Sequence, residues 1–452
     1  MTDTAASLLG RTLFGAQGES PFSDARLLAA MLRFEAALAE GQAALGLIPA
    51  EAAARIGETV HTLTLDVAAM ARAGAHAGTL AIPVVRALTD AVAERDPDAA
   101  RYVHAGATSQ DVIDTALSLC AKEALGRIDA ATRDAIAAGL DLVDRFAGTP
   151  VLARTLMQPA GLTTFGCRAA QWTAGIADGW VALRRSARDA VALSLSGPIG
   201  TLAAWGEAGD ALRAAVAERL DLPDPGAPWH GVRNGRLRCA SEAAILVGAF
   251  AKVGEDVALG AQFEVGEVSE PAADGRGGSS AMPHKRNPAL SLRLIAAGQR
   301  VPGLMATLLG AQVNAFERGL GGWQTECATW PALLETALGA AETAATVLLG
   351  LEIHTDRAQA NIAALQGVFA ADRVAGWLTP ALGKVQAQGL AARWSAEALS
   401  RREPLESVVR RALGAQTPAI AADGLDACFD VGSAVEAAAR TARALASRVR
   451  GT

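Results

Sequence analysis

The sequence GGSSAMPHKRNP, residues 277–288, combines mobile backbone, hydroxyl groups and positive charge in one short stretch. Its glycines tolerate backbone angles that other residues resist, so the serines that follow can lie on a loop that moves or approaches a ligand closely. Asn287 is a favourable helix N-cap and Pro288 suits the first helical position. A helix start carries partial positive charge, which Lys285 and Arg286 reinforce. The pattern predicts a place where an anion is held and a hydroxyl closes over it.

A second polar stretch, RYVHAGATSQD at residues 101–111, has a related pattern. Ser109 can cap the helix that follows, and Thr108, Ser109 and Gln110 then offer hydroxyl, amide and backbone N–H groups at its start. Such a helix start is a seat for an anion. Taken alone, the stretch favours the simpler interpretation of a plain helix cap.

These polar stretches lie in a chain whose composition predicts an almost wholly α-helical protein. Of 452 residues, 51% are hydrophobic but only 4% are aromatic, with a single tyrosine and abundant alanine and leucine. The net charge is −6 and no basic run is visible, which argues against nucleic acid as a partner. An acidic protein that binds a polyanionic substrate must therefore concentrate its positive charge locally.

The cysteine pattern and the N-terminus indicate a cytoplasmic protein. The five cysteines are widely spaced with no CxxC pair, which favours reduced thiols over a disulfide framework or a zinc site. No signal-peptide pattern opens the chain, and no run of about 18 uncharged apolar residues predicts a membrane span.

Helix signals predict the organisation of the chain. Ser23 or Asp24 begins a first helix that Gly46 can end, and Ser241 is a candidate cap for a helix running to about residue 268. Residues 111–146 contain no proline and carry a sustained apolar stripe, so a long helix is expected there. A helix of that length needs bundle partners. We expect an N-terminal helical domain (1–100), a central long-helix bundle domain (101–350) and a C-terminal helical domain (351–452).

The motifs resemble those of the fumarase/aspartase superfamily. Residues 277–288 match its signature GSSxMPxKxNP, residues 104–111 match HxGxTSxD, and residues 155–166 match TxxQxAxPxTxG in part. The resemblance implies an all-α fold in which long helices of four subunits form a shared bundle, with each active site assembled from different chains. It assigns proton transfer at carbon to Ser279. The residues that it implies as substrate contacts are His104, Thr108, Ser109, Gln158, Lys285 and Asn287, with His104 also the candidate for a second proton-transfer group.

Finer features resemble one branch of that superfamily, the bacterial 3-carboxy-cis,cis-muconate cycloisomerases. Leu156 stands where fumarases and the adenylosuccinate and argininosuccinate lyases usually have a histidine, and leucine cannot transfer a proton. The ER…G.WQ.E pattern at residues 317–326 also fits this branch. The resemblance covers roughly residues 20–345. It implies conversion of 3-carboxy-cis,cis-muconate to 4-carboxymuconolactone in the protocatechuate branch of aromatic degradation, without metal or organic cofactor.

Several alternatives stay open on the sequence. A fumarate-releasing enzyme, such as adenylosuccinate or argininosuccinate lyase, would use the same carboxylate clamp and serine. A sulfonated muconate would fit the same residues, and a non-enzymatic helical scaffold is a third class, against which the intact serine loop argues. His230 is as consistent with a core position as with a site position.

Overall fold

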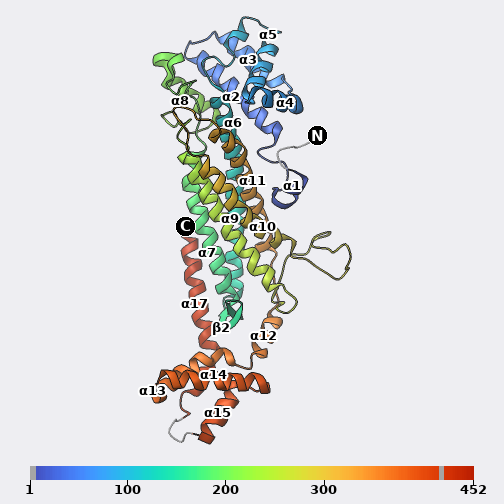
Figure 1. Cartoon of the computed structure of the whole chain (residues 1–452), viewed down its shortest axis with the longest axis vertical. Helices are drawn as coiled ribbons and strands as arrows, with labels where there is room; N and C mark the ends of the chain where they lie inside the picture. Colours follow the sequence, from blue (N-terminus) through green and yellow to red (C-terminus); the bar gives the residue numbers. More distant parts are fainter. Residues whose placement is uncertain (1–6, 417–421, 452) are drawn as a thin grey trace. The chain divides into compact units, whose positions relative to one another are not determined.

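The computed structural model describes residues 7–416 and 422–451, and within them the chain is mostly helical, as predicted (Figure 1). The strands in this described part form two small antiparallel two-stranded sheets. Contacts divide the chain into two compact units that are each built from three separate segments. The first unit takes residues 1–133, 178–251 and 293–344, and the second takes 134–177, 252–292 and 345–452.

The first unit contains the N-terminal helices. Its helix α2 begins where the sequence predicts, because the Ser23 hydroxyl accepts a hydrogen bond from the N–H of Arg26, and Gly46 follows its end with a φ of +70°. The short helices of this unit are α1 (Leu8–Phe14), α2 (Asp24–Ala44), α3 (Ala50–Thr62), α4 (Val67–Ala77), α5 (Ala81–Ala93), η1 (Ala99–Tyr102), η2 (Ala203–Ala208) and α8 (Gly209–Leu220).

Five longer helices have residues in both units: α6 (Ser109–Phe146), α7 (Phe165–Ala190), α9 (Asn234–Gly260), α10 (Ala289–Gly310) and α11 (Gly322–Leu349). The predicted long helix is α6, which has 38 residues. The prediction for Ser241 was wrong: α9 already begins at Asn234, and the Ser241 hydroxyl bonds back to the carbonyl of Leu237 within the helix. Helix α11 is apolar enough to cross a membrane by length and composition, but 67% of its most apolar window is buried, as in a core helix.

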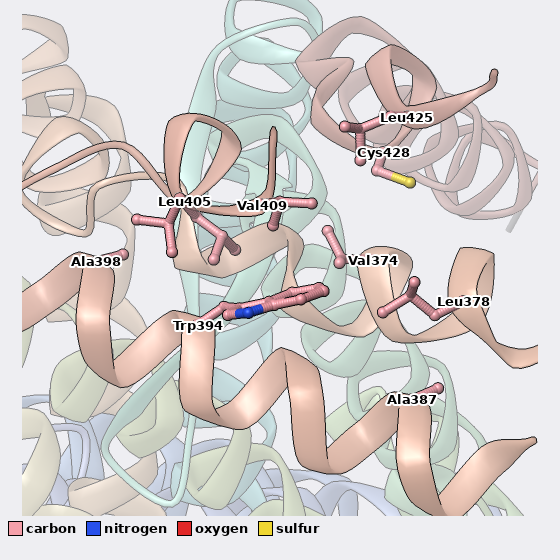
Figure 2. Packing of buried hydrophobic residues seen from close by; sticks show 10 residues of the cluster. Val374, Leu378, Ala387, Trp394, Ala398, Leu405, Val409, Leu425 and Cys428 are labelled. Atoms are coloured by element: carbon pink, nitrogen blue, oxygen red, sulfur yellow. The ribbon is translucent and has the colours of Figure 1, made fainter. Parts of the chain in front are cut away.

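The second unit combines a hairpin with the C-terminal helices. Strands β1 (Pro150–Thr155) and β2 (Gln158–Thr164) form the hairpin, and Trp394 lies at the centre of a buried cluster with Val374, Leu405 and Val409 (Figure 2). The remaining elements of this unit are β3 (Val268–Ser269), β4 (Glu352–Ile353), α12 (Thr355–Ala364), η3 (Val368–Ala370), α13 (Ala371–Leu382), α14 (Lys384–Arg401), α15 (Leu405–Gln416), α16 (Leu425–Phe429) and α17 (Val431–Arg450).

A buried cluster of charges joins three helices inside the first unit. Arg233 donates to both oxygens of Asp114 on α6, at 2.8 and 2.9 Å, and to Glu326 on α11 at 2.9 Å. Arg236 on α9 donates to the same two carboxylates at 2.9 and 3.0 Å, and the Trp323 indole donates to Asp114 at 3.1 Å. Two arginines thus face two carboxylates, and each charge has an opposite partner.

The cluster keeps Asp114 ionised although no solvent reaches its side chain. Burial by itself would raise the pKa of Asp114, but attraction to Arg233 and Arg236, with hydrogen bonds from Arg233 and Trp323, outweighs it and holds this pKa well below its ordinary value. A carboxyl with a depressed folded-state pKa stabilises the fold above its unfolded pKa of about 4, and that contribution is lost as the pH falls below this value.

Replacing Asp114 with Asn should therefore lower the free energy of unfolding by about 3–5 kcal/mol, because Arg233 and Arg236 would remain buried with too little negative charge. Urea unfolding monitored by circular dichroism measures this loss, which should shrink below about pH 4. The matched control is Asp141→Asn on the same helix, where an exposed ion pair with Arg145 predicts an effect of about 0.5 kcal/mol or less. Equal losses in the two variants would contradict the assignment.

Candidate active site

The buried carboxylate of Asp111 organises the start of α6. It accepts hydrogen bonds from the N–H of Thr108 at 3.0 Å, from the N–H groups of Ser196 and Gly197 at 2.9 and 3.0 Å, and has Nε2 of His230 at 2.8 Å. Because Thr108 precedes the first helical residue, Ser109, the capping position falls one residue earlier than predicted. Asp111 therefore holds in place the backbone of the predicted anion seat at the start of α6.

His230 belongs to this support and not to an open site. Its side chain is buried, its Nε2 faces Asp111, and its carbonyl accepts a hydrogen bond from the Gln110 amide at 3.1 Å. Of the two interpretations that the sequence left open, the buried position supports the structural one.

His104 lies in the loop just before the anion seat and is held by a residue of α2. Its Nδ1 is 2.7 Å from Oε1 of Glu35, whose side chain is fully buried. Burial by itself would lower the pKa of His104, but attraction to Glu35, the hydrogen bond with it, and the nearby Asp111 together raise it above its ordinary value. The sequence contained Glu35 on an otherwise apolar helix face, and an acid at a core-facing position was the available signal.

Arg318 is a second residue that the sequence analysis did not select. Its guanidinium donates to the Thr108 hydroxyl at 2.9 Å, so a cation adjoins the predicted anion seat. Arg318 lies between α10 and α11 and follows Glu317. The residue before Glu317, Phe316, has a left-handed backbone with a φ of +52°. In the sequence, Arg318 stood out only as part of the ER…G.WQ.E pattern, which does not indicate a contact with Thr108.

The signature residues lie on a long loop between α9 and α10 in the second unit (Figure 1). The Ser279 hydroxyl oxygen accepts hydrogen bonds from the N–H of Met282 at 3.1 Å and of Ala281 at 3.4 Å. Donors aimed at this oxygen stabilise negative charge on it. Lys285 is exposed, and Asn287 is half-buried with its N–H bonded to the carbonyl of Gly277 at 2.7 Å.

The start of α10 is not the free anion seat that the sequence predicts. Helix α10 begins at Ala289, and the Glu270 carboxylate accepts hydrogen bonds from the N–H groups of Leu290 at 3.0 Å and Ser291 at 2.6 Å. Asn287 lies before the capping position, and its amide donates to the carbonyl of Gly278 at 3.4 Å. The positive end of this helix thus already faces a carboxylate of the chain itself.

Gln158 lies at the tip of the β1–β2 hairpin and is exposed. The two turn residues before it, Leu156 and Met157, both have left-handed backbone angles, with φ of +49° and +65°. This turn normally favours Asn or Gly, so two large apolar residues here are strained. Leu156 is also 97% exposed, which leaves this apolar side chain free to contact a ligand or another chain.

An ion pair with the buried carboxylate of Glu267 anchors the hairpin close to its tip, because Arg154 lies one residue before the last paired residue of β1. Arg154 donates to both oxygens of Glu267, at 2.7 and 2.9 Å, and Asn361 donates to the same carboxylate at 3.0 Å. Burial by itself would raise the pKa of Glu267, but the hydrogen bonds from Arg154 and Asn361 and the attraction of Arg154 and Arg168 lower it. The hairpin that carries Gln158 is therefore anchored next to its turn, while the side chains of Leu156 and Gln158 stay exposed.

A groove with a volume of about 740 Å³ lies beside the hairpin within the second unit. Its lining includes Arg154, Arg168 and Lys252, together with Leu156 and Trp172. Burial, together with repulsion from Arg154, outweighs attraction to Glu267 and Asp256 and lowers the pKa of Arg168. Asp256 also lines the groove and pairs with Lys252, so the groove combines charges of both signs with apolar surface.

The predicted site residues fall into two groups. His104, Thr108 and Ser109 lie in one short segment of the first unit, together with Arg318. The second group, in the second unit, consists of Ser279, Lys285 and Asn287 on the loop and Gln158 on the hairpin. No group of three or more His, Cys, Asp or Glu side chains within the described ranges is arranged to hold a metal ion.

Comparison with known proteins defines the class. A family model described as Lyase matches residues 10–303, and the chain belongs to this fumarase/aspartase lyase family. The 3-carboxy-cis,cis-muconate cycloisomerase of Bradyrhizobium diazoefficiens is 40% identical over 409 residues, covering 90% of this chain and 91% of that protein. The nitrosuccinate lyase of Streptomyces davaonensis is 41% identical over 418 residues, covering 90% and 87%. The crystal structure of the 3-carboxy-cis,cis-muconate lactonizing enzyme from Pseudomonas putida matches with a TM-score of 0.88 and 33% identity, covering 98% and 99%.

A substitution at Gly277 tests whether the contact between Gly277 and Asn287 closes the base of the signature loop. Gly277 has a φ of +67°, and a Cβ there would lie 2.4 Å from the carbonyl oxygen of Asn287, so Gly277→Ala should break the contact that closes the loop. Trypsin should then cleave after Lys285 and Arg286 at least about tenfold faster, because local opening exposes the backbone.

The matched control is Gly275→Ala. Gly275 has a similar φ of +74°, but a Cβ there meets no atom within 4 Å, so only backbone strain is added. Mass spectrometry of the fragments measures both rates. Equal rates for Gly277→Ala and the wild type would contradict the closed base of the loop.

Proposed function

We propose that this protein is a 3-carboxy-cis,cis-muconate cycloisomerase, which forms 4-carboxymuconolactone in the protocatechuate branch of aromatic degradation. The observation that carries the proposal is the combination of an intact serine loop with an exposed leucine, Leu156, at the hairpin tip. The cycloisomerase relatives that match most of the chain support it.

The reaction needs charge stabilisation and one proton. A carboxylate oxygen of the substrate attacks a carbon of the double bond conjugated to another carboxylate, forming the C–O bond of the lactone. The electron pair of the double bond moves onto the conjugated carboxylate and gives an enediolate. The carbon next to that carboxylate then takes one proton, so the product carries one negative charge fewer than the substrate. Preorganised donors that face the enediolate lower the barrier most effectively.

The two groups of residues suit these requirements. Ser279 would deliver the proton to carbon, and the N–H groups of Met282 and Ala281 would stabilise the oxyanion left behind. The ammonium group of Lys285 on the same loop would pair with a substrate carboxylate. The amide and hydroxyl donors of the proposed clamp are Asn287, Gln158, Thr108 and Ser109.

Leu156 favours an intramolecular nucleophile. An enzyme that eliminates an amine or water needs a group that exchanges a proton with the leaving group, and leucine has none. In a cycloisomerase the attacking carboxylate already belongs to the substrate and is ionised, so an apolar residue at this position is acceptable.

A second candidate is a lyase that acts on a substituted succinate. The nitrosuccinate lyase of Streptomyces davaonensis resembles this chain as closely as the cycloisomerases do. Removing a proton beside a succinate carboxylate also produces an enediolate, so the same clamp and the same serine would serve. Adenylosuccinate and argininosuccinate remain the further alternatives of this kind.

We propose that the protein acts as a cytoplasmic homotetramer with active sites shared between chains. The segment between α10 and α11 exposes Val313, Phe316 and Leu320 by 87, 95 and 100%, and such apolar exposure is typical of surfaces buried in an assembly. An assembly would also bring the first group of site residues to the second. The five cysteines are free thiols, which suits a reducing compartment.

A substrate panel tests the proposal. Purified protein is supplied separately with 3-carboxy-cis,cis-muconate, nitrosuccinate and adenylosuccinate, while ultraviolet absorbance is followed and products are identified by NMR. The expected outcome is turnover of the muconate to the lactone with the highest kcat/KM. Turnover of one of the succinates alone would overturn the cycloisomerase proposal in favour of the second candidate.

Substitution of the loop serine tests the mechanism. Ser279→Ala should lower kcat about 10²–10⁴-fold, because the proton donor to carbon is lost. The control is Ser280→Ala, the adjacent exposed serine, which should stay within about threefold of the wild type on the same reasoning. If both variants lose activity equally, or if Ser279→Ala keeps normal turnover, Ser279 does not deliver the proton.

A further inference from the structure

Helix α2 buries two polar side chains on a face that is otherwise apolar. Glu35 and Gln42 are each 2% exposed and lie seven residues apart, on the same side of the helix as Leu28, Met31 and Leu38. Burying a carboxylate is costly unless the charge is paired. A buried carboxylate at a core-facing position therefore needs a partner that offsets the loss of its hydration.

Both side chains reach the same loop, in front of the anion seat. Glu35 contacts Nδ1 of His104 at 2.7 Å, and Nε2 of Gln42 donates to the carbonyl of Ala105 at 2.8 Å. His104 has a φ of +57°, in the left-handed region that a residue with a Cβ disfavours. The loop is thus held in a strained conformation by two contacts from α2, of which only one carries charge.

The contact with Glu35 fixes how the His104 ring is protonated. An ionised carboxylate only accepts hydrogen bonds, so Nδ1 carries the hydrogen and donates it to Glu35. The other ring nitrogen, Nε2, has no hydrogen-bond partner among the described residues, and the His104 side chain is about one-fifth exposed. Nε2 is therefore available to a ligand.

The charge on Glu35 has little other compensation. Its second oxygen, Oε2, is buried without a hydrogen-bond partner, so His104 is the group that pairs with this carboxylate. The other titratable group that acts on His104 is Asp111 on α6, which is also acidic. Two carboxylates from two helices therefore act on one imidazole, and both favour its cationic form.

We propose that Glu35 is a positioning residue that keeps His104 in its imidazolium form with Nε2–H directed to a carboxylate of the substrate. This role rests on the proposed function for the identity of the ligand, but the pairing itself does not. The imidazolium adds a second cation to the segment that carries Thr108, whose hydroxyl accepts a hydrogen bond from Arg318, so this segment suits a substrate with more than one carboxylate.

The test measures the pKa of His104 directly in the full-length protein. The sequence has only six histidines, so NMR of histidine-labelled protein resolves their titrations, and His104→Gln assigns the signal. In the wild type this pKa should lie above about 6.5, and in Glu35→Gln it should fall by about 1–3 units. Gln42→Leu is the control, because it loosens the same loop without removing charge, and it should shift the pKa by less than about 0.5 unit.

Kinetics provide a readout that a purely structural role would not move. In Glu35→Gln, KM should rise at least about tenfold above the lowered pKa and recover as the pH falls and His104 becomes protonated again, whereas Gln42→Leu should show no such recovery. A wild-type pKa at or below about 6.5 overturns the proposal whether or not the variants fold, and equal shifts in both variants also overturn it. A shifted pKa in a protein that does not turn over the muconate would instead refute the proposed function alone.

Discussion

Buried carboxylates that accept hydrogen bonds from loops are the constraint on which the rest of this structure depends. Asp111 gathers Thr108, Ser196 and Gly197 around the start of α6, and one turn later Asp114 anchors α6 to α9 and α11 through Arg233 and Arg236. Each carboxylate is costly to bury, and each is paired. The donors of the first group are thereby held in place before any substrate arrives, which is the condition for electrostatic catalysis.

In the second unit, carboxylates that accept hydrogen bonds hold the two segments that carry site residues. Glu270 occupies the start of α10 and Glu267 holds Arg154 next to the hairpin turn, so both segments that carry site residues are anchored by a carboxylate. Their tips, with Ser279 and Lys285 on one and Leu156 and Gln158 on the other, remain exposed or half-exposed. Anchored segments with exposed side chains suit a site that closes over its ligand.

Local signals in the sequence predicted local features well. The cap at Ser23, the glycine after α2 and the long α6 follow from composition and periodicity, and the signature predicted which residues share one loop. Contacts between distant segments gave no such signal: nothing near Glu35 indicates His104, and nothing near Glu270 indicates α10. Ser241 failed as a cap because serine also bonds within a helix. For the contact between Glu35 and His104, the one signal from periodicity was that an acidic residue occupies a core-facing position of α2.

The central claim is that the two groups of polar residues act on one polycarboxylate. A crystal structure of the assembled protein with propane-1,2,3-tricarboxylate tests it most directly. The account predicts one carboxylate about 2.7–3.2 Å from donors of Thr108, Ser109 or Arg318, and another at that distance from Lys285 or Asn287. A ligand that contacts only one group, with the other group of every chain out of reach, would contradict it.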